Sequence, residues 1–197
     1  YYADSAVVAY RTASEEVSIA DLHPKTITNA GSIDATALLD DDLNSAIVIP
    51  APGSGGPAWL QYEFERPFKA RAFSIAGRTG IPVGRMLASD DGSQFRTLAV
   101  LPGPQGYRGG LVRTFAFPET SARFYRLELS AAPLTPAAVM NAVPMQPAKE
   151  YVLTEAVLHS GGRVHRWEDK AGFSLLFEYE SSPTPAIQPA AAIARSE

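Results

Sequence analysis

Residues 40–45, called the acidic turn below, place three consecutive carboxylates at Asp40, Asp41 and Asp42, followed by an amide and the hydroxyl of Ser45. Such a set of oxygens suits a hard cation such as calcium, which takes about six to eight oxygen ligands at flexible angles. The same residue types are common in solvent-exposed turns, because short polar side chains hydrogen-bond to nearby backbone. The residues alone therefore leave two alternatives open, a calcium site and a solvated turn.

A second group of candidate residues lies in a predicted loop, where Tyr107 stands between Gly106 and Arg108. An exposed ring of this kind could stack on a pyranose while the guanidinium donates hydrogen bonds to its hydroxyl groups. We therefore predict Tyr107 and Arg108 as carbohydrate-binding residues. The alternative is a loop tyrosine that folds back onto the core.

No complete catalytic site is predicted. Glycoside hydrolysis needs two carboxyl groups about 5–9.5 Å apart on either side of the scissile bond, and carboxylates on one turn cannot flank a sugar. Glu63 and Glu65 share the outer face of a predicted strand. Counting residues does not exclude a Ser-His-Asp triad, but no Gly-x-Ser-x-Gly elbow is present. His159 and His165 flank a Gly-Gly turn, where a metal site would need a third ligand and only Glu168 or Asp169 stands near in the sequence. We interpret the two as strand-end histidines.

The composition is that of a globular domain. Of 197 residues, 46% are hydrophobic and 19% are charged, with a net charge of -4 and no cysteine. The acidic balance argues against a nucleic-acid partner, which needs a basic face, and no apolar run is long enough to span a membrane. The absence of cysteine excludes disulfides and thiolate metal sites. Because the chain starts without Met, we expect it to be a fragment of a longer protein.

Short strands separated by turns must position these candidate residues. Apolar side chains recur at every second position in 124–129 and in most of 59–64, which is the pattern of a strand with one buried face. Asp91-Gly92 between two such segments predicts a hairpin turn. With no convincing amphipathic helix, the pattern predicts an all-β antiparallel β-sandwich of the jelly-roll type. The other predicted strands are 6–10, 16–19, 46–49, 71–75, 85–88, 95–101, 111–117 and 151–158.

The chain divides into four parts by composition. We predict a segment leading into the sandwich (1–30), the sandwich itself (31–160), an exit segment (161–180) and a Pro-rich linker or tail (181–197). The sandwich carries a Pro/Ala-rich loop insertion at 131–149, whose length indicates either a functional or a poorly ordered loop.

Several motifs resemble the discoidin, or coagulation-factor C-type, fold. The resemblance lies in Leu38–Ser45, the Trp-Leu-Gln strand at 59–64, Ser-Asp-Asp-Gly at 89–92, Ala-Arg-Phe-Tyr-Arg-Leu at 122–127 and Leu-Thr-Glu-Ala at 153–156. It implies a structural calcium held by the acidic turn and the last strand. The implied ligands are Asp40, Asp42, Ser45 and Glu155. Asp41 stands where the family usually has Gly, and Ser45 where it usually has Thr. The alternative is that Glu155 caps the turn by accepting hydrogen bonds from backbone N–H groups.

The two flanks of the sandwich resemble a second family. Residues 2–12 and 159–173 are similar to the segments that lead into and out of the inserted β-sandwich of family-106 α-L-rhamnosidases, which are large bacterial glycoside hydrolases. The resemblance implies that the domain is a non-catalytic accessory of an enzyme whose catalytic acids lie on a separate barrel of the same polypeptide. It also implies a periplasmic or secreted parent protein.

Two other functions stay open from the sequence. The first is an autonomous carbohydrate-binding module, because of the discoidin-like motifs. The second is an adhesion domain that binds protein or lipid head groups. That function calls for apolar spikes ringed by Lys or Arg, whereas the predicted loops are rich in Pro, Gly and Ala.

Overall fold

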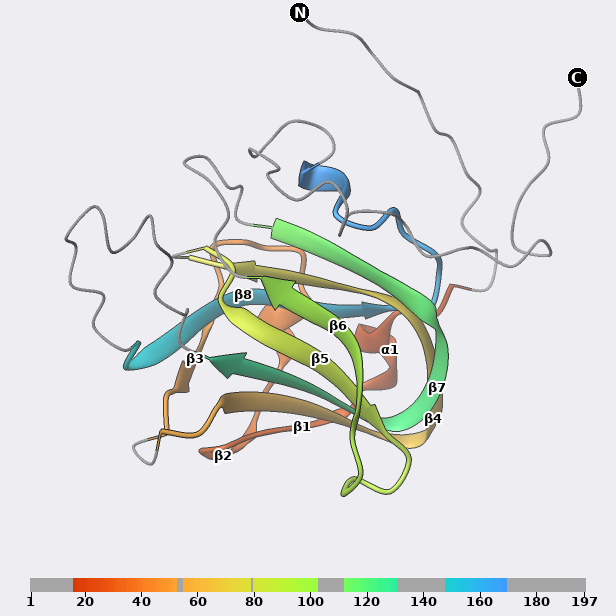
Figure 1. Cartoon of the computed structure of the whole chain (residues 1–197), viewed down its shortest axis with the longest axis horizontal. Helices are drawn as coiled ribbons and strands as arrows, with labels where there is room; N and C mark the ends of the chain where they lie inside the picture. Colours follow the sequence, from red (N-terminus) through yellow and green to blue (C-terminus); the bar gives the residue numbers. More distant parts are fainter. Residues whose placement is uncertain (1–15, 53–54, 79, 103–111, 131–147, 170–197) are drawn as a thin grey trace, which may run out of the picture.

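The protein is described by a computed structural model, which covers residues 16–52, 55–78, 80–102, 112–130 and 148–169 (Figure 1). Within these ranges the fold is carried by eight strands, together with the short α-helix α1 (Ile19–Leu22) and the 3-10 turn η1 (Thr36–Leu38). The strands are β1 (Lys25–Thr28), β2 (Gly31–Ile33), β3 (Ile47–Pro50), β4 (Ala58–Gly77), β5 (Val83–Ser89), β6 (Arg96–Pro102), β7 (Val112–Ser130) and β8 (Glu150–His159).

The strands pair antiparallel throughout and form two layers that share β4 and β7. One layer has the order β2-β1-β4-β7-β5-β6, and in the other β8 joins the second half of β4 and carries β3 at its edge. Both long strands curve at one side of the molecule (Figure 1), where the β4–β7 register shifts between Glu63 and Phe68 and again between Ala70 and Ala72. Such irregularities bend a strand, so β4 and β7 can each serve both layers of the predicted all-β sandwich.

The space between the layers is filled by apolar side chains from both long strands. Tyr62, Tyr125, Phe73 and Phe115 are almost fully buried there, together with leucines and isoleucines. Each buried tyrosine keeps a partner for its hydroxyl group, since Tyr62 Oη donates to the carbonyl of Ala156 at 2.7 Å and Tyr125 Oη lies 2.7 Å from that of Phe68. The interior is therefore a packed core.

The predicted hairpin at Asp91-Gly92 is confirmed, because it joins the antiparallel pair β5 and β6. Gly92 has φ 76°, which a glycine adopts without strain. Asp91 Oδ1 accepts hydrogen bonds from the backbone N–H groups of Gln94 and Ser93, and these bonds lower the pKa of its carboxyl group.

Several predicted elements differ from the observed ones. The predicted strands 59–64 and 71–75 are both parts of β4, and 111–117 and 124–129 are both parts of β7. The prediction of a strand over 16–19 was wrong. Ser18 forms an isolated bridge to His159 and its hydroxyl caps the N-terminus of α1, which begins at Ile19. The predicted strand at 6–10 lies outside the described residues.

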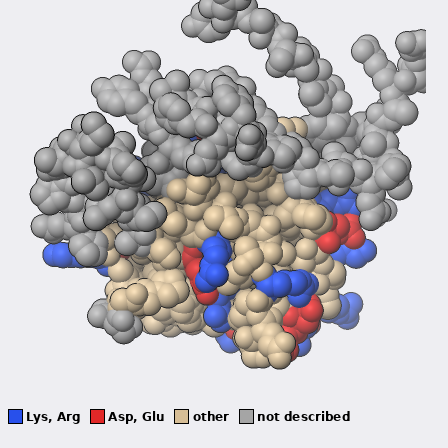
Figure 2. Space-filling view, in the orientation of Figure 1, with Lys and Arg blue, Asp and Glu red and all other residues tan. Residues whose placement is uncertain are grey.

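The outer surface carries several pairs of opposite charge. Arg85 on β5 binds Glu128 on β7, Arg96 binds Asp90, and Lys25 on β1 binds Glu63 on β4. Figure 2 shows basic and acidic atoms side by side on the face that it presents, separated by uncharged surface. Exposed pairs of this kind contribute little to stability, about 0–1 kcal/mol each.

Candidate functional site

The acidic turn joins η1 to β3 and is closed by its own side chains. Ser45 Oγ donates to Asp40 Oδ2 at 2.8 Å, and Asp42 Oδ1 accepts from the backbone N–H and the amide group of Asn44 at 2.9 and 2.7 Å. The bonds from Asn44 lower the pKa of Asp42. Asp41 has φ 57°, the left-handed conformation that Asp tolerates better than most residues. The turn thus takes its shape with Asp at the position where the resemblance leads one to expect Gly.

Glu155 lies on β8 beside this turn. Burial raises its pKa, and the carboxylates of Asp41 and then Asp40 raise it further. Within the described part of the chain the carboxylate of Glu155 makes no hydrogen bond or ion pair, so the alternative in which it caps the turn through backbone N–H groups is not what the structure shows. The fold has therefore brought an unpaired carboxylate from the last strand next to a turn that lies more than a hundred residues earlier in the sequence.

A basic residue that the sequence did not single out also reaches the acidic turn. Arg78, directly after β4, donates from Nη2 to the carbonyl of Asn44 at 2.6 Å, while its backbone N–H binds the carbonyl of Val152. The guanidinium of Arg78 thus binds the turn through a backbone carbonyl.

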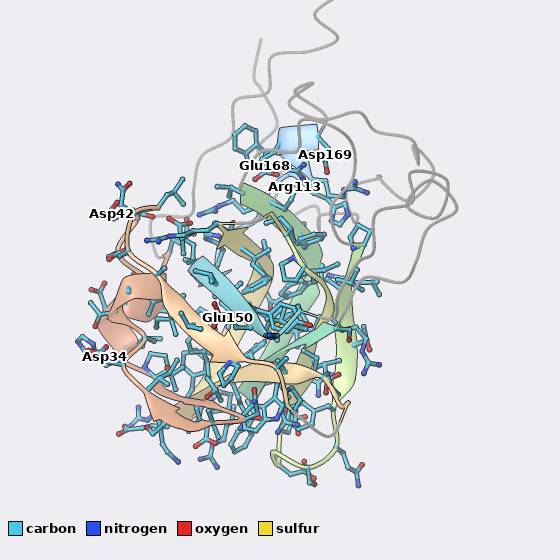
Figure 3. All side chains as sticks on the ribbon, turned by 90° about the vertical axis from the view of Figure 1, so that its left-hand side faces the viewer. Asp34, Asp42, Arg113, Glu150, Glu168 and Asp169 are labelled. Atoms are coloured by element: carbon cyan, nitrogen blue, oxygen red, sulfur yellow. The ribbon has the colours of Figure 1, made fainter. Side chains whose placement is uncertain are left out.

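The predicted calcium ligands fit a cation only in part. Asp40, Asp42, Ser45 and Glu155 are brought to one side of the molecule, and Figure 3 shows Asp42 at the surface. Over the described ranges, however, no group of three or more acidic or imidazole side chains is arranged to hold a metal ion. Backbone carbonyl groups of the turn would have to complete the coordination. Tyr107 and Arg108, the predicted carbohydrate-binding residues, lie outside the described residues.

A second polar cluster lies where β8 ends at His159, and of its members the sequence had indicated only His159 and Glu168. Here one hydrogen-bonded chain, called the seam below, runs across the outer face of three neighbouring strands. His159 Nε2 lies 2.8 Å from Ser74 Oγ on β4, which in turn lies 3.0 Å from Thr114 Oγ1 on β7. The members of the seam, in order, are Glu16, Arg163, His159, Ser74, Thr114 and Glu168.

The residues at the two ends of the seam determine which atom donates in each of its hydrogen bonds. Arg163 can only donate, so Nδ1 of His159 accepts from it and the imidazole proton sits on Nε2, facing Ser74. At the other end Thr114 Oγ1 donates to the carboxylate of Glu168 at 2.7 Å, which leaves Ser74 to donate to Thr114. The ring nitrogen facing Ser74 is thus a donor and not a base, so this Ser–His pair is not an activated nucleophile.

Burial and the neighbouring Arg163 lower the pKa of His159 to about 4. The imidazole is therefore neutral at neutral pH, as the seam requires. His165 does not meet His159 across the glycine turn. Its Nδ1 instead accepts from the backbone N–H of Ala116 at 3.1 Å, so the two histidines form no metal site together.

Two further ion pairs, both buried, lie at the end of the described part of the exit segment. Asp169 Oδ1 lies 2.8 Å from Nε of Arg113 on β7, and its Oδ2 lies 2.7 Å from Nε of Arg166. All three side chains are less than a tenth exposed, and Figure 3 shows Arg113, Glu168 and Asp169 gathered at one end of the molecule. Sequence reasoning missed Ser74, Thr114 and Arg113 because a buried polar residue has no pattern that separates it from an exposed one.

Comparison with known proteins supplies the family and the fold. The sequence matches the α-L-rhamnosidase family, glycoside hydrolase family 106, over residues 1–197. No curated protein matches it. A rhamnosidase from Novosphingobium sp. PP1Y superposes with a TM-score of 0.59 at 21% identity, over 83% of this chain and 14% of that one. This chain therefore spans a small part of that enzyme's length.

This chain also superposes on nearly the whole of a second, smaller protein of known structure. It is a labelled mutant of chitosan-binding module 1, derived from a chitosanase/glucanase of Paenibacillus sp. IK-5. The TM-score is 0.50 at 12% identity, over 70% of this chain and 95% of the module. At such identities both likenesses show the fold. Among the described residues no helix is long and apolar enough to cross a membrane.

Proposed function

The chain belongs to the family-106 α-L-rhamnosidases, and from that premise we propose that it is a non-catalytic β-sandwich domain that supports the catalytic part of a larger enzyme of this kind. The observation that carries the proposal is the packed interior. Apolar side chains fill the space between the layers, and the carboxylates of Glu16, Glu63, Glu119 and Glu128 are held in ion pairs on the outside. Glycoside hydrolysis needs two carboxyl groups on either side of the scissile bond, whereas these four carboxylates are engaged in ion pairs.

Activity measurements on two proteins test this proposal. The 197-residue chain should release no product from an aryl α-L-rhamnoside, whereas the longer polypeptide that contains it should do so. Removing residues 31–160 from the longer polypeptide should lower its melting temperature and its yield of folded protein, because the removed surface supports the rest. Turnover by the isolated chain at the rate of the longer protein would show the proposal to be wrong.

Carbohydrate binding is the second candidate function, favoured by the superposition on a chitosan-binding module. We propose Tyr107 and Arg108 as the residues that contact the sugar. Calorimetry with rhamnose-containing and chitosan oligosaccharides should show binding that Tyr107→Ala and Arg108→Ala weaken at least tenfold. Arg66→Ala, which removes an exposed cation elsewhere, should leave it unchanged. Heat of binding that survives both loop substitutions would place the site elsewhere.

We also propose that the acidic turn and Glu155 attract a calcium ion, with Asp40, Asp42, Ser45 and Glu155 as ligands. The unpaired Glu155, crowded by Asp41 and Asp40, supports a cation there, since a bound cation would relieve the repulsion. A ligand that binds only the folded state raises its stability, by about 2.7 kcal/mol at a hundred times its Kd. Calcium should accordingly raise the melting temperature, and EDTA should reverse the rise.

Asp34 offers a matched control for this calcium test. Like Asp42, Asp34 is an exposed aspartate whose Oδ1 accepts the backbone N–H two residues ahead, here that of Thr36 at 2.9 Å. Asp34→Ala should keep the calcium-dependent rise, and Asp42→Ala should abolish it. If EDTA leaves the melting curve of the unsubstituted chain unmoved, the turn holds no calcium and is stabilised by its own hydrogen bonds.

A further inference from the structure

Among the described strands, the first half of β7 has a neighbour on one side only. Residues 112–116 pair with β4, and β5 joins β7 only from Phe124 onward. In the described residues no strand pairs with the other edge of this half. An unpaired strand edge presents free N–H and C=O groups to any other strand and is a site of unwanted association.

The exit segment covers this edge with bonds of its own. The backbone N–H of Thr114 donates to Glu168 Oε2 at 3.0 Å, and its carbonyl accepts from the N–H of Arg166 at 2.7 Å. The N–H of Ala116 donates to His165. Side chains and backbone of residues 165–168 therefore take the place of a neighbouring strand, as the position of the blue segment above β7 in Figure 1 shows.

Small side chains on the outer face below make room for this cover. Ala72 and Ala76 point outward from β4 yet are fully buried, and Ser74 and Thr114 beside them are less than a tenth exposed. Larger residues at these positions would hold the exit segment away from the sheet. The seam then anchors the segment through the hydroxyl groups of Ser74 and Thr114, and the ion pair of Arg113 with Asp169 anchors its far end.

The segment that leads into the sandwich is tied to the same place. Arg163 Nη2 binds Glu16 Oε1 at 2.6 Å, and the hydroxyl of Ser160 accepts from the N–H of Val17 at 2.9 Å. The two points where the chain meets the sandwich are thus fastened to each other. The ion pair of Glu16 with Arg163 joins the entry segment to the exit segment directly.

We propose that residues 161–169 act as a latch that covers the free edge of β7 and fixes the direction in which the polypeptide leaves the sandwich. In the longer enzyme the sandwich and the part that follows it then move as one body. This inference rests on the proposed function, because a fixed exit direction matters only if a further domain follows the sandwich. Without the latch the edge of β7 is open to pairing with a second copy of the chain.

Two adjacent glycines allow a sharp test. A Cβ atom at Gly161 would lie 2.8 Å from Glu16 Oε2 and 3.0 Å from Arg163 Nη1, whereas a Cβ at Gly162 meets nothing within 4 Å. Both atoms near Gly161 belong to the far ends of flexible side chains. Gly161→Ala should therefore push the Glu16 carboxylate off Arg163 without disturbing the core, and Gly162→Ala should change nothing.

Hydrogen exchange followed by mass spectrometry on the 197-residue chain measures how well the latch protects its own amides. In Gly161→Ala the amides of 160–169 should exchange at least tenfold faster, trypsin should cut after Arg163, and dimers should appear with rising concentration. The amides of β4 and β5 should keep their protection, which shows that the sandwich is still folded. Thr114→Val, which removes the hydroxyl that donates to Glu168 Oε1, should act in the same direction.

Two results would overturn the latch. One is equal exchange of 160–169 in Gly161→Ala and Gly162→Ala, and the other is unprotected exchange of these amides in the unsubstituted chain. Neither result depends on enzymatic activity. A longer polypeptide without rhamnosidase activity but with a protected exit segment would refute the proposed function and leave the latch standing.

Discussion

Lowering the pH from 6.5 to 4 should destabilise the sandwich through one imidazole, that of His159. In the folded chain its Nδ1 accepts from Arg163 and its Nε2 faces Ser74. A proton added to Nδ1 would face the guanidinium, so the seam cannot accept the charged form. In the unfolded chain the same imidazole is free to take up that proton at its ordinary pKa.

The size and sign of the effect follow from the two pKa values. Burial and Arg163 lower the pKa of His159 from 6.5 to about 4 in the folded state. Between these values the unfolded chain binds more protons, so the free energy of unfolding falls as the pH falls. At about 1.4 kcal/mol for each pH unit, and with the imidazole only partly buried, the loss amounts to about 2–3 kcal/mol. The contribution is fully present above pH 6.5 and fully lost below pH 4.

Urea unfolding at a series of pH values measures this loss, and two variants isolate it. His159→Gln removes the titrating group, so its free energy of unfolding should depend less on pH by the same 2–3 kcal/mol between pH 7 and 4. His23→Asn is the control, because His23 is exposed and Asn tolerates the left-handed conformation, φ 44°, at that position. Its pH dependence should match that of the unsubstituted chain. The difference between the two variants isolates the contribution of His159.

A pH dependence of His159→Gln equal to that of the unsubstituted chain would refute this role of the imidazole. An NMR titration that places the pKa of His159 near 6.5 would refute it as well, since the seam would then tolerate a charged imidazole.

Three further changes have expected outcomes. Tyr62→Phe removes the hydroxyl that binds the carbonyl of Ala156 and should lower the free energy of unfolding in urea by about 1–2 kcal/mol; no loss would mean that the carbonyl finds another partner. Gly84→Ala places a Cβ against the backbone carbonyl of Glu128, forces β5 from β7 and should cost about 3 kcal/mol in the same assay. Glu155→Gln removes a carboxylate whose pKa is raised by burial, Asp41 and Asp40, so in EDTA at pH 7 its melting temperature should rise, and a fall would show that the charge is stabilised by a partner.

The sequence by itself determined the class of fold and most of the strands. A period of two in residues 124–129 identified a strand with one buried face, because only side chains on the core side lose water. Asp91-Gly92 identified its turn through local chemistry alone, since a glycine accepts positive φ wherever it stands. The short strands β1 and β2, by contrast, were not predicted. Their burial patterns over 25–28 and 31–33 are too brief to show a period.

For the acidic turn, the residue types could be read from the sequence, and the resemblance supplied the pairing with Glu155. Only the tertiary structure shows that Glu155 stands beside Asp41 without a partner and that Arg78 reaches the carbonyl of Asn44. In both cases the two residues lie far apart in the sequence and meet only when the sheet folds. No local sequence pattern therefore encodes these contacts.

The outer face of β4 and β7 was decided wholly by the tertiary structure. Ser74 and Thr114 alternate with core residues, as polar residues on any exposed face do, and the period of two assigns them to solvent. They are buried because the chain leaves β8, returns across the same face and places Glu168 against them. Periodicity tells which side of a strand faces away from the core, whereas what covers that side depends on where a distant segment comes to rest.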